Sequence, residues 1–148
     1  MSIIKKIIFI IFTITFVVEV NAEEVKKMGT HKDWETYIIN SDTGRVCFAQ
    51  SKPVLQSPKN SPREARLFIS FRPGEKITNE ISVTAGYEFN NKNSVIAQSG
   101  KNKYKLDLVQ DGFAWMTGTK LEIKMIKTMK RGSRIMITGN TQTGSSTI

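Results

Sequence analysis

The sequence is poor in the residue types that build disulfides, metal centres and catalytic sites. Its 148 residues include one Cys and one His, so neither an internal disulfide nor a Cys₂His₂ zinc site can form. The 13 acidic residues show no paired spacing typical of glycosidases or metal sites. Neither a Gly-x-Ser-x-Gly motif nor a glycine-rich phosphate loop occurs. We therefore expect a protein that is not an enzyme and that holds no cofactor or metal.

The single histidine and the single cysteine have simple structural interpretations. His31 lies in a charged stretch where an exposed side chain is expected. Cys47 leaves three interpretations open: a small buried hydrophobic residue, a crosslink to another molecule, or a nucleophile. We expect the first, with Cys47 in the structural core. Large aromatic side chains should anchor the same core, because they bury large areas in small β domains. These are Trp34, Tyr87 and Trp115.

No apolar run is long enough for a membrane-spanning helix, which needs about 20 residues. Residues 7–18 form an apolar or Thr run of only 12 residues, preceded by Lys5 and Lys6 and followed by a Val-x-Ala sequence ending at Ala22. This layout is typical of a signal peptide. We predict that residues 1–22 are removed by cleavage after Ala22 and that the protein is periplasmic or secreted. The alternative, an uncleaved N-terminal anchor, also implies export.

Acidic residues are too few to balance the 22 basic ones, and the formal net charge is +9. Removing residues 1–22 takes away Lys5, Lys6 and Glu19, which leaves 20 basic and 12 acidic residues and a net charge of +8. Such a charge favours anionic partners: phospholipid head groups, lipopolysaccharide, acidic glycans or nucleic acid. Export makes nucleic acid the least expected of these. The alternative is that the excess lysine only keeps the domain soluble.

Alternation with a period of two residues dominates the chain after residue 33. It is clearest in residues 80–88, where Ile81, Val83 and Ala85 share one side, as in a half-buried antiparallel strand. Asp42-Thr43-Gly44 predicts a hairpin turn, and the proline-rich residues 52–63 predict a loop. Residues 23–32 are polar and predict a flexible lead-in. The domain at 33–148 is thus expected to be all-β, a two-sheet antiparallel β-sandwich of seven to eight short strands. The expected strands are 34–39, 45–50, 67–72, 80–88, 95–98, 104–108, 113–116 and 135–137.

One short helix is expected near residues 119–131. Thr119-x-x-Glu122 resembles a capping box at its start, and Gly132 stands where a left-handed residue often ends a helix. Leu121, Met125 and Met129 recur on one face and indicate a core-facing stripe. Basic residues fall on another face.

Two groups of basic residues are candidates for binding an anionic surface. One lies on the expected helix and the other on the outward side of an expected strand, and binding through either would weaken with added salt. The alternative is that both are solvated faces of amphipathic elements. The candidate residues are Lys103, Lys105, Lys120, Lys124, Lys127 and Arg131.

Several short pieces together resemble the invasion-associated locus B family of exported bacterial proteins. They occur in order over residues 33–148. The pieces are Asp33-Trp34, Arg45-Val46-Cys47-Phe48-Ala49, Pro53, Arg66, Arg72-Pro73, Ile81-Ser82-Val83, Gly86-Tyr87, Ala114-Trp115, Met129-Lys130-x-Gly132, Gly139 and Thr143-Gly144.

The resemblance implies a non-enzymatic, β-rich periplasmic or surface protein that contacts an envelope or host-surface protein and has a role in host-cell entry in some pathogens. The alternative function is a periplasmic binder of anionic lipid or glycan through the lysine-rich faces. Two departures from the family pattern stand out. Tyr37 occupies a position where many relatives have a second Cys, and relatives continue beyond the piece at Thr143 with a further strand. The resemblance therefore implies that the domain is truncated at its C-terminus.

Overall fold

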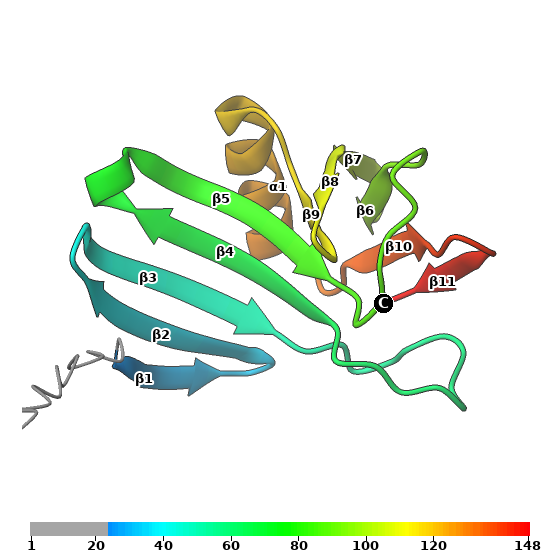
Figure 1. The fold of residues 1–148 in the computed structure, drawn as a ribbon, viewed down its shortest axis with the longest axis horizontal. Helices are drawn as coiled ribbons and strands as arrows, with labels where there is room; N and C mark the ends of the chain where they lie inside the picture. Colours follow the sequence, from blue (N-terminus) through cyan, green and yellow to red (C-terminus); the bar gives the residue numbers. More distant parts are fainter. Residues whose placement is uncertain (1–23) are drawn as a thin grey trace, which may run out of the picture.

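The computed structural model describes residues 24–148, which form eleven β-strands, one α-helix and one short 3₁₀ helix. The protein is mostly β, and its strands form two antiparallel sheets (Figure 1). This confirms the expected all-β class with one short helix. The predicted signal peptide, with its cleavage after Ala22, lies outside the described residues.

The larger sheet has seven strands in the order β1-β2-β3-β4-β5-β9-β8. Each neighbouring pair is antiparallel, and β1 to β5 follow one another in the chain, so short connections join most neighbours. The strand bounds are β1 Val25–His31, β2 Trp34–Ser41, β3 Gly44–Ser51, β4 Arg66–Arg72, β5 Ile77–Thr84, β8 Leu108–Gln110 and β9 Phe113–Trp115. The 3₁₀ helix η1, Pro73–Glu75, joins β4 to β5.

The smaller sheet has four strands in the order β11-β10-β6-β7. Its strands are β6 Val95–Ser99, β7 Asn102–Leu106, β10 Met136–Asn140 and β11 Ser145–Thr147. The helix α1, Thr119–Arg131, lies beside β5 and next to this sheet, while β1 to β3 extend away from it (Figure 1).

Both sheets and the helix contribute to one hydrophobic core. Leu67, Ile81 and Val83 enter it from the larger sheet, and Met125 enters it from α1 with no exposed surface. The smaller sheet contributes Val95, Ala97, Tyr104, Leu106 and Ile137. The helix therefore packs against both sheets through the face that carries Met125, and the face that carries its basic residues is exposed to solvent.

Three strands lie outside the expected eight. Val25–His31, in the predicted flexible lead-in, forms β1, which pairs with β2. Every residue of β1 is exposed, so this edge strand rests on backbone hydrogen bonds and needs no apolar alternation. The other two are β8 and β11. The expected strand at 104–108 is interrupted at Asp107, so that β7 ends at Leu106 and β8 begins at Leu108, and β11 lies near the C-terminus.

The helix has the expected bounds, but both predicted caps are wrong. Gly118 is the N-cap and no side chain caps the start, because Thr119 is already helical and Glu122 turns inward with 7% of its surface exposed. Gly132 is extended, at φ −86°, and not left-handed. A Cβ built there would lie 2.7 Å from Oγ of Ser99, so close approach to β6 explains this glycine.

The predicted hairpin at residues 42–44 is confirmed as the β2–β3 turn. Ser41 Oγ donates to the carbonyl oxygen of Gly44 at 2.8 Å, and Gly44 has a φ of +117°. The tip of this hairpin rests on η1. A Cβ built at Gly74 would lie 2.0 Å from the Thr43 carbonyl oxygen, so only glycine fits there.

Candidate functional site

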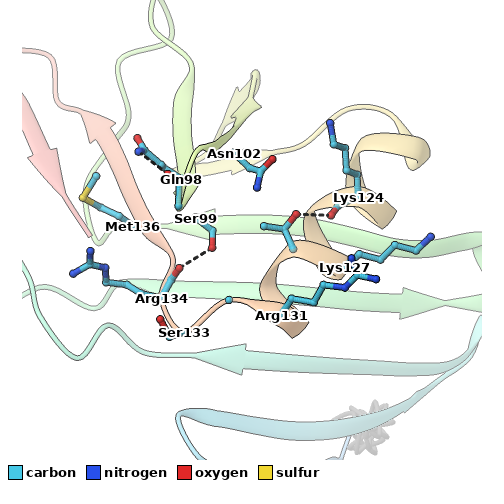
Figure 2. Close-up of a pocket in the computed structure, with 12 residues that line it drawn as sticks. Gln98, Ser99, Asn102, Lys124, Lys127, Arg131, Ser133, Arg134 and Met136 are labelled. Carbon is cyan, nitrogen blue, oxygen red and sulfur yellow. Dashed lines mark hydrogen bonds between the residues drawn. The ribbon is translucent and has the colours of Figure 1, made fainter.

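A basic groove lies between the C-terminal half of α1 and the strands β6, β7 and β10 (Figure 2). Its volume is about 790 Å³. We call it the basic groove because four cationic side chains and no carboxylate line it: Lys124, Lys127, Arg131 and Arg134. Figure 2 shows Arg134 on the strand side and Lys127 and Arg131 on the helix side.

Hydrogen bonds between secondary-structure elements hold the walls of the groove together. The hydroxyl of buried Tyr104, on β7, lies 2.6 Å from Oγ1 of Thr128, which donates to the carbonyl of Lys124 at 3.1 Å. Ser99 Oγ, on β6, donates to the carbonyl of Arg134 at 2.8 Å. These bonds fix both the helix turn that carries Lys124 and the segment after the helix against the smaller sheet.

The net positive charge of the chain comes from the segments that form this groove. The β6–β7 hairpin and residues 119–140 contain nine of the 20 basic residues found after residue 22, but only one of the 12 acidic ones, the inward-facing Glu122. The remaining eleven basic and eleven acidic residues balance. The net charge of +8 therefore belongs to these two segments.

The four groove cations are available to a ligand. All four are exposed. The ion pairs within the part of the chain that the structure describes involve other cations, namely Lys27, Arg66 and Arg72.

The structure brings together half of the predicted anion-binding residues. Lys124, Lys127 and Arg131 line the groove, whereas Lys120 lies one turn nearer the start of α1. Lys103 and Lys105 alternate with Tyr104, which faces the helix, so their side chains lie on the other face of the smaller sheet.

Arg134 is the groove cation that the sequence did not reveal. It lies after the helix and before β10, in a stretch without regular periodicity. The bond from Ser99 to its carbonyl and the pairing of Met136 with Gln98 place it beside the groove.

The predicted core residues divide into two pairs. Trp34 and Tyr87 are half-buried and pack against the core. Cys47 and Trp115 do not belong to it, so the prediction is wrong for these two. For Trp115 the reason is that the alternation specifies two faces of each strand without saying which face the second sheet and the helix cover. Cys47 lies on the same sheet face as Ile69 and Ile81, but β3 extends away from the helix and the smaller sheet, so this face is not covered there.

Trp115 belongs to an aromatic row on the opposite face of the larger sheet. Ring centroids along the row are 5.0, 6.3, 6.2 and 5.4 Å apart. Each of these rings is half-buried. The row consists of Tyr37, Phe48, Phe68, Phe113 and Trp115.

His31 and Cys47 do not meet. Cys47 pairs with Ile38 and His31 lies level with Trp34, so four residues of β2 separate them, about 13 Å along the strand. No group of three or more His, Cys, Asp and Glu side chains among residues 24–148 could hold a metal ion. Within the same range, no helix is long and apolar enough to cross a membrane.

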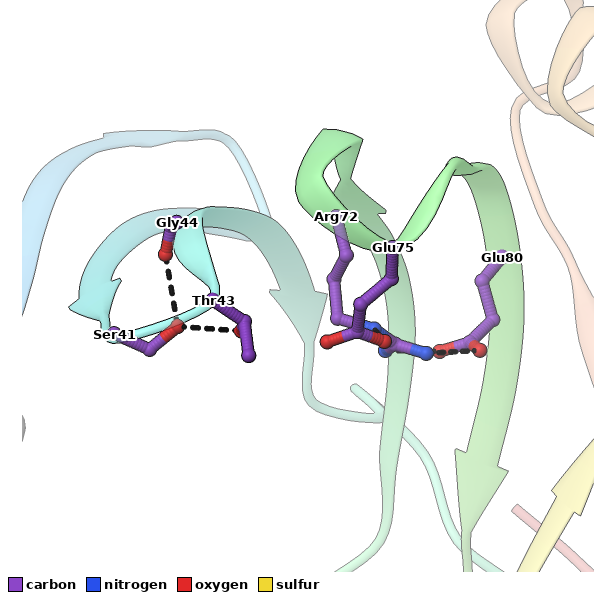
Figure 3. Close-up of polar contacts among 6 residues, drawn as sticks. All are labelled: Ser41, Thr43, Gly44, Arg72, Glu75 and Glu80. Atoms are coloured by element: carbon purple, nitrogen blue, oxygen red, sulfur yellow. Dashed lines mark hydrogen bonds and ion pairs between the residues drawn. The ribbon is translucent and has the colours of Figure 1, made fainter.

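A second cavity of about 620 Å³ lies near the start of α1. Arg72 lies between two carboxylates beside it, bonding both oxygens of Glu80 at 2.8 Å and Oε2 of Glu75 at 2.9 Å (Figure 3). Glu122 also lines this cavity. Burial, together with the charge of Glu80, raises the pKa of Glu122, although a hydrogen bond from the backbone of Ile81 opposes the shift.

Comparison with known protein families, curated proteins and solved structures gave no match for this chain.

Proposed function

We propose that this protein is an exported, non-enzymatic envelope protein that attaches to an anionic lipid surface through the basic groove. The observation that carries the proposal is the segregation of charge. The whole net charge of residues 23–148 lies in the segments that form the groove, and no carboxylate lines it.

Lysine and arginine side chains suit phosphate head groups. Arginine can donate two parallel hydrogen bonds to a phosphate, and lysine supplies a mobile point charge. Near an anionic membrane each such side chain contributes about 1 kcal/mol of attraction. Lys124, Lys127 and Arg131 follow one another at intervals of three and four residues, so one exposed helix face presents all three to a charged surface.

Two further parts of the proposal concern location and architecture. The signal-peptide pattern and the resemblance to the invasion-associated locus B family support export to the periplasm or beyond. The resemblance also supports the proposal that the protein contacts an envelope or host-surface protein. The finer fold assignment, a two-sheet β-sandwich, is supported by the single core to which Leu67 and Val83 contribute from one sheet and Ala97 and Ile137 from the other.

Co-sedimentation with lipid vesicles tests the proposed attachment. Vesicles containing phosphatidylglycerol should bind the protein, and vesicles of phosphatidylcholine alone should not. Binding should fall between about 0.1 M and about 1 M salt, because the Debye length shortens from about 10 Å to about 3 Å. Inorganic phosphate as a competitor separates recognition of a single phosphate group from attachment to a charged surface. Equal binding to both kinds of vesicle, or indifference to salt, would contradict the proposal.

A further inference from the structure

The second cavity lies between the start of α1 and the strands β5, β8 and β9, and Trp115, the last ring of the aromatic row, lines it. Trp115 pairs with Ser82 on β5 and with Leu108 on β8. Residues paired across antiparallel strands share a face, so Leu108 and Gln110 lie on the same face as Trp115 and Phe113. Trp115, Leu108 and Gln110 line the cavity, whereas Ser82 and Phe113 do not.

Trp115 gives this cavity an aromatic wall. Its indole ring stacks on Phe113, with centroids 5.4 Å apart and an angle of 28° between the planes. Trp115 is half-buried and borders the cavity, so the exposed part of the indole is open to a ligand.

Polar groups that both donate and accept hydrogen bonds line the same cavity. The guanidinium of Arg72 is held in place by Glu80, and the side chains of these two residues are 25% and 19% exposed. Gln110 is exposed, and its amide donates to Asp111 at 3.0 Å. The hydroxyls of Thr78 and Thr119 also line the cavity.

The charge of this cavity differs from that of the basic groove. Two basic residues, Arg72 and Lys76, face three acidic ones, Glu80, Asp111 and Glu122. Because the charges nearly balance and the most buried cation is already paired, a polyanion gains little here. An uncharged ligand with several hydroxyl groups fits better.

We propose that this cavity binds a sugar unit of an uncharged glycan chain. A pyranose ring has an apolar C–H face that can pack on the indole of Trp115, and its hydroxyls both donate and accept hydrogen bonds. Arg72, Glu80 and Gln110 supply those partners. A concave site with one aromatic wall and a few convergent polar groups is typical of small-ligand binding.

This glycan site is separate from the basic groove and does not depend on the proposed attachment to lipid. The groove lies at the C-terminal half of α1, whereas the glycan site adjoins Gly118 and Thr119 at its start. The two sites share no lining residue. One protein could therefore hold a charged surface and a neutral glycan at once.

Tryptophan fluorescence tests the proposal directly. The chain has two tryptophans, so Trp34→Phe leaves Trp115 as the only one. The probes are β-1,4-linked tetrasaccharides of glucose and of N-acetylglucosamine, with glycerol as a control for nonspecific effects. At least one tetrasaccharide should change the emission of Trp115 in a saturable way. If Trp34→Phe fails to fold, the NMR signal of the indole N–H of Trp115 in the unsubstituted protein reports binding instead.

Gln110→Ala should weaken binding of that tetrasaccharide about three- to tenfold, as expected for one lost hydrogen bond. The matched control is Gln98→Ala, which removes the same side chain from the basic groove. The proposal is overturned if neither tetrasaccharide gives a saturable change at Trp115, or if Gln110→Ala and Gln98→Ala bind equally well. Vesicle binding measured on the same samples reports the basic groove separately, so either proposal can fail alone.

Discussion

Removing three charges from the basic groove should abolish most of the attachment to acidic vesicles. The variant carries Lys124→Gln, Lys127→Gln and Arg131→Gln. At about 1 kcal/mol for each basic side chain near an anionic membrane, the three contribute about 3 kcal/mol. That loss corresponds to about 150-fold weaker partitioning at low salt, since each 1.4 kcal/mol is a factor of ten. Co-sedimentation with phosphatidylglycerol vesicles measures it, and the difference should shrink as salt is added.

The structure explains why this variant should still fold. The three side chains are exposed, and glutamine has nearly the helix propensity of lysine and arginine. Arg131 lies in the last turn, where a cation favours the helix dipole, so a loss of a few tenths of a kcal/mol is expected. The midpoint of thermal unfolding should therefore change little.

The matched control changes the net charge equally at positions outside the groove. Lys26, Lys59 and Lys92 are exposed and lie on β1, in the proline-rich loop and in the turn before β6. Replacing these three by glutamine should weaken vesicle binding far less than the groove variant does. Equal losses would refute the reasoning, because they would mean that the total charge, and not its location, governs attachment.

Three further predictions concern stability. Met125→Ala should lower the free energy of unfolding by about 2–5 kcal/mol in denaturant titrations, because Met125 is fully buried where α1 meets the core. Gly74→Ala should cost about 1–3 kcal/mol or more, since its Cβ would collide with the Thr43 carbonyl oxygen, whereas Gly29→Ala, with its nearest atom at 3.8 Å, should be nearly neutral. The hydrogen bond from Lys27, followed by those from neighbouring side chains, lowers the pKa of Glu35 to about 2 from 4.5. Its stabilising contribution is thus complete above pH 4.5 and lost as the pH falls toward 2, so thermal unfolding of Glu35→Gln should show a smaller acid dependence than the unsubstituted protein.

Much of the fold could be predicted from local patterns. The alternation that begins at residue 80 marks β5, although β5 ends at Thr84 and not at residue 88. The Asp42-Thr43-Gly44 turn marks the β2–β3 hairpin, and the apolar stripe marks the helix within its observed bounds. Strand β1 could not be found in this way. As an edge strand it is stabilised by pairing with β2, and that pairing leaves no apolar pattern in the residues themselves.

The candidate sites were only partly predictable for a related reason. The lysines on the helix share a face by periodicity, so Lys124, Lys127 and Arg131 could be grouped from the sequence. Arg134 could not, because its position depends on contacts with β6. Trp115 was assigned to the core because alternation does not reveal which sheet face is covered.

The sequence by itself determined the mostly β composition, the single helix and the excess of positive charge, because each depends on neighbours along the chain. The tertiary structure decided which basic side chains line one groove, which face of the larger sheet is left uncovered by the helix and the smaller sheet, and at which positions close packing requires glycine. These properties depend on how residues distant in sequence pack together, and no local pattern encodes that packing.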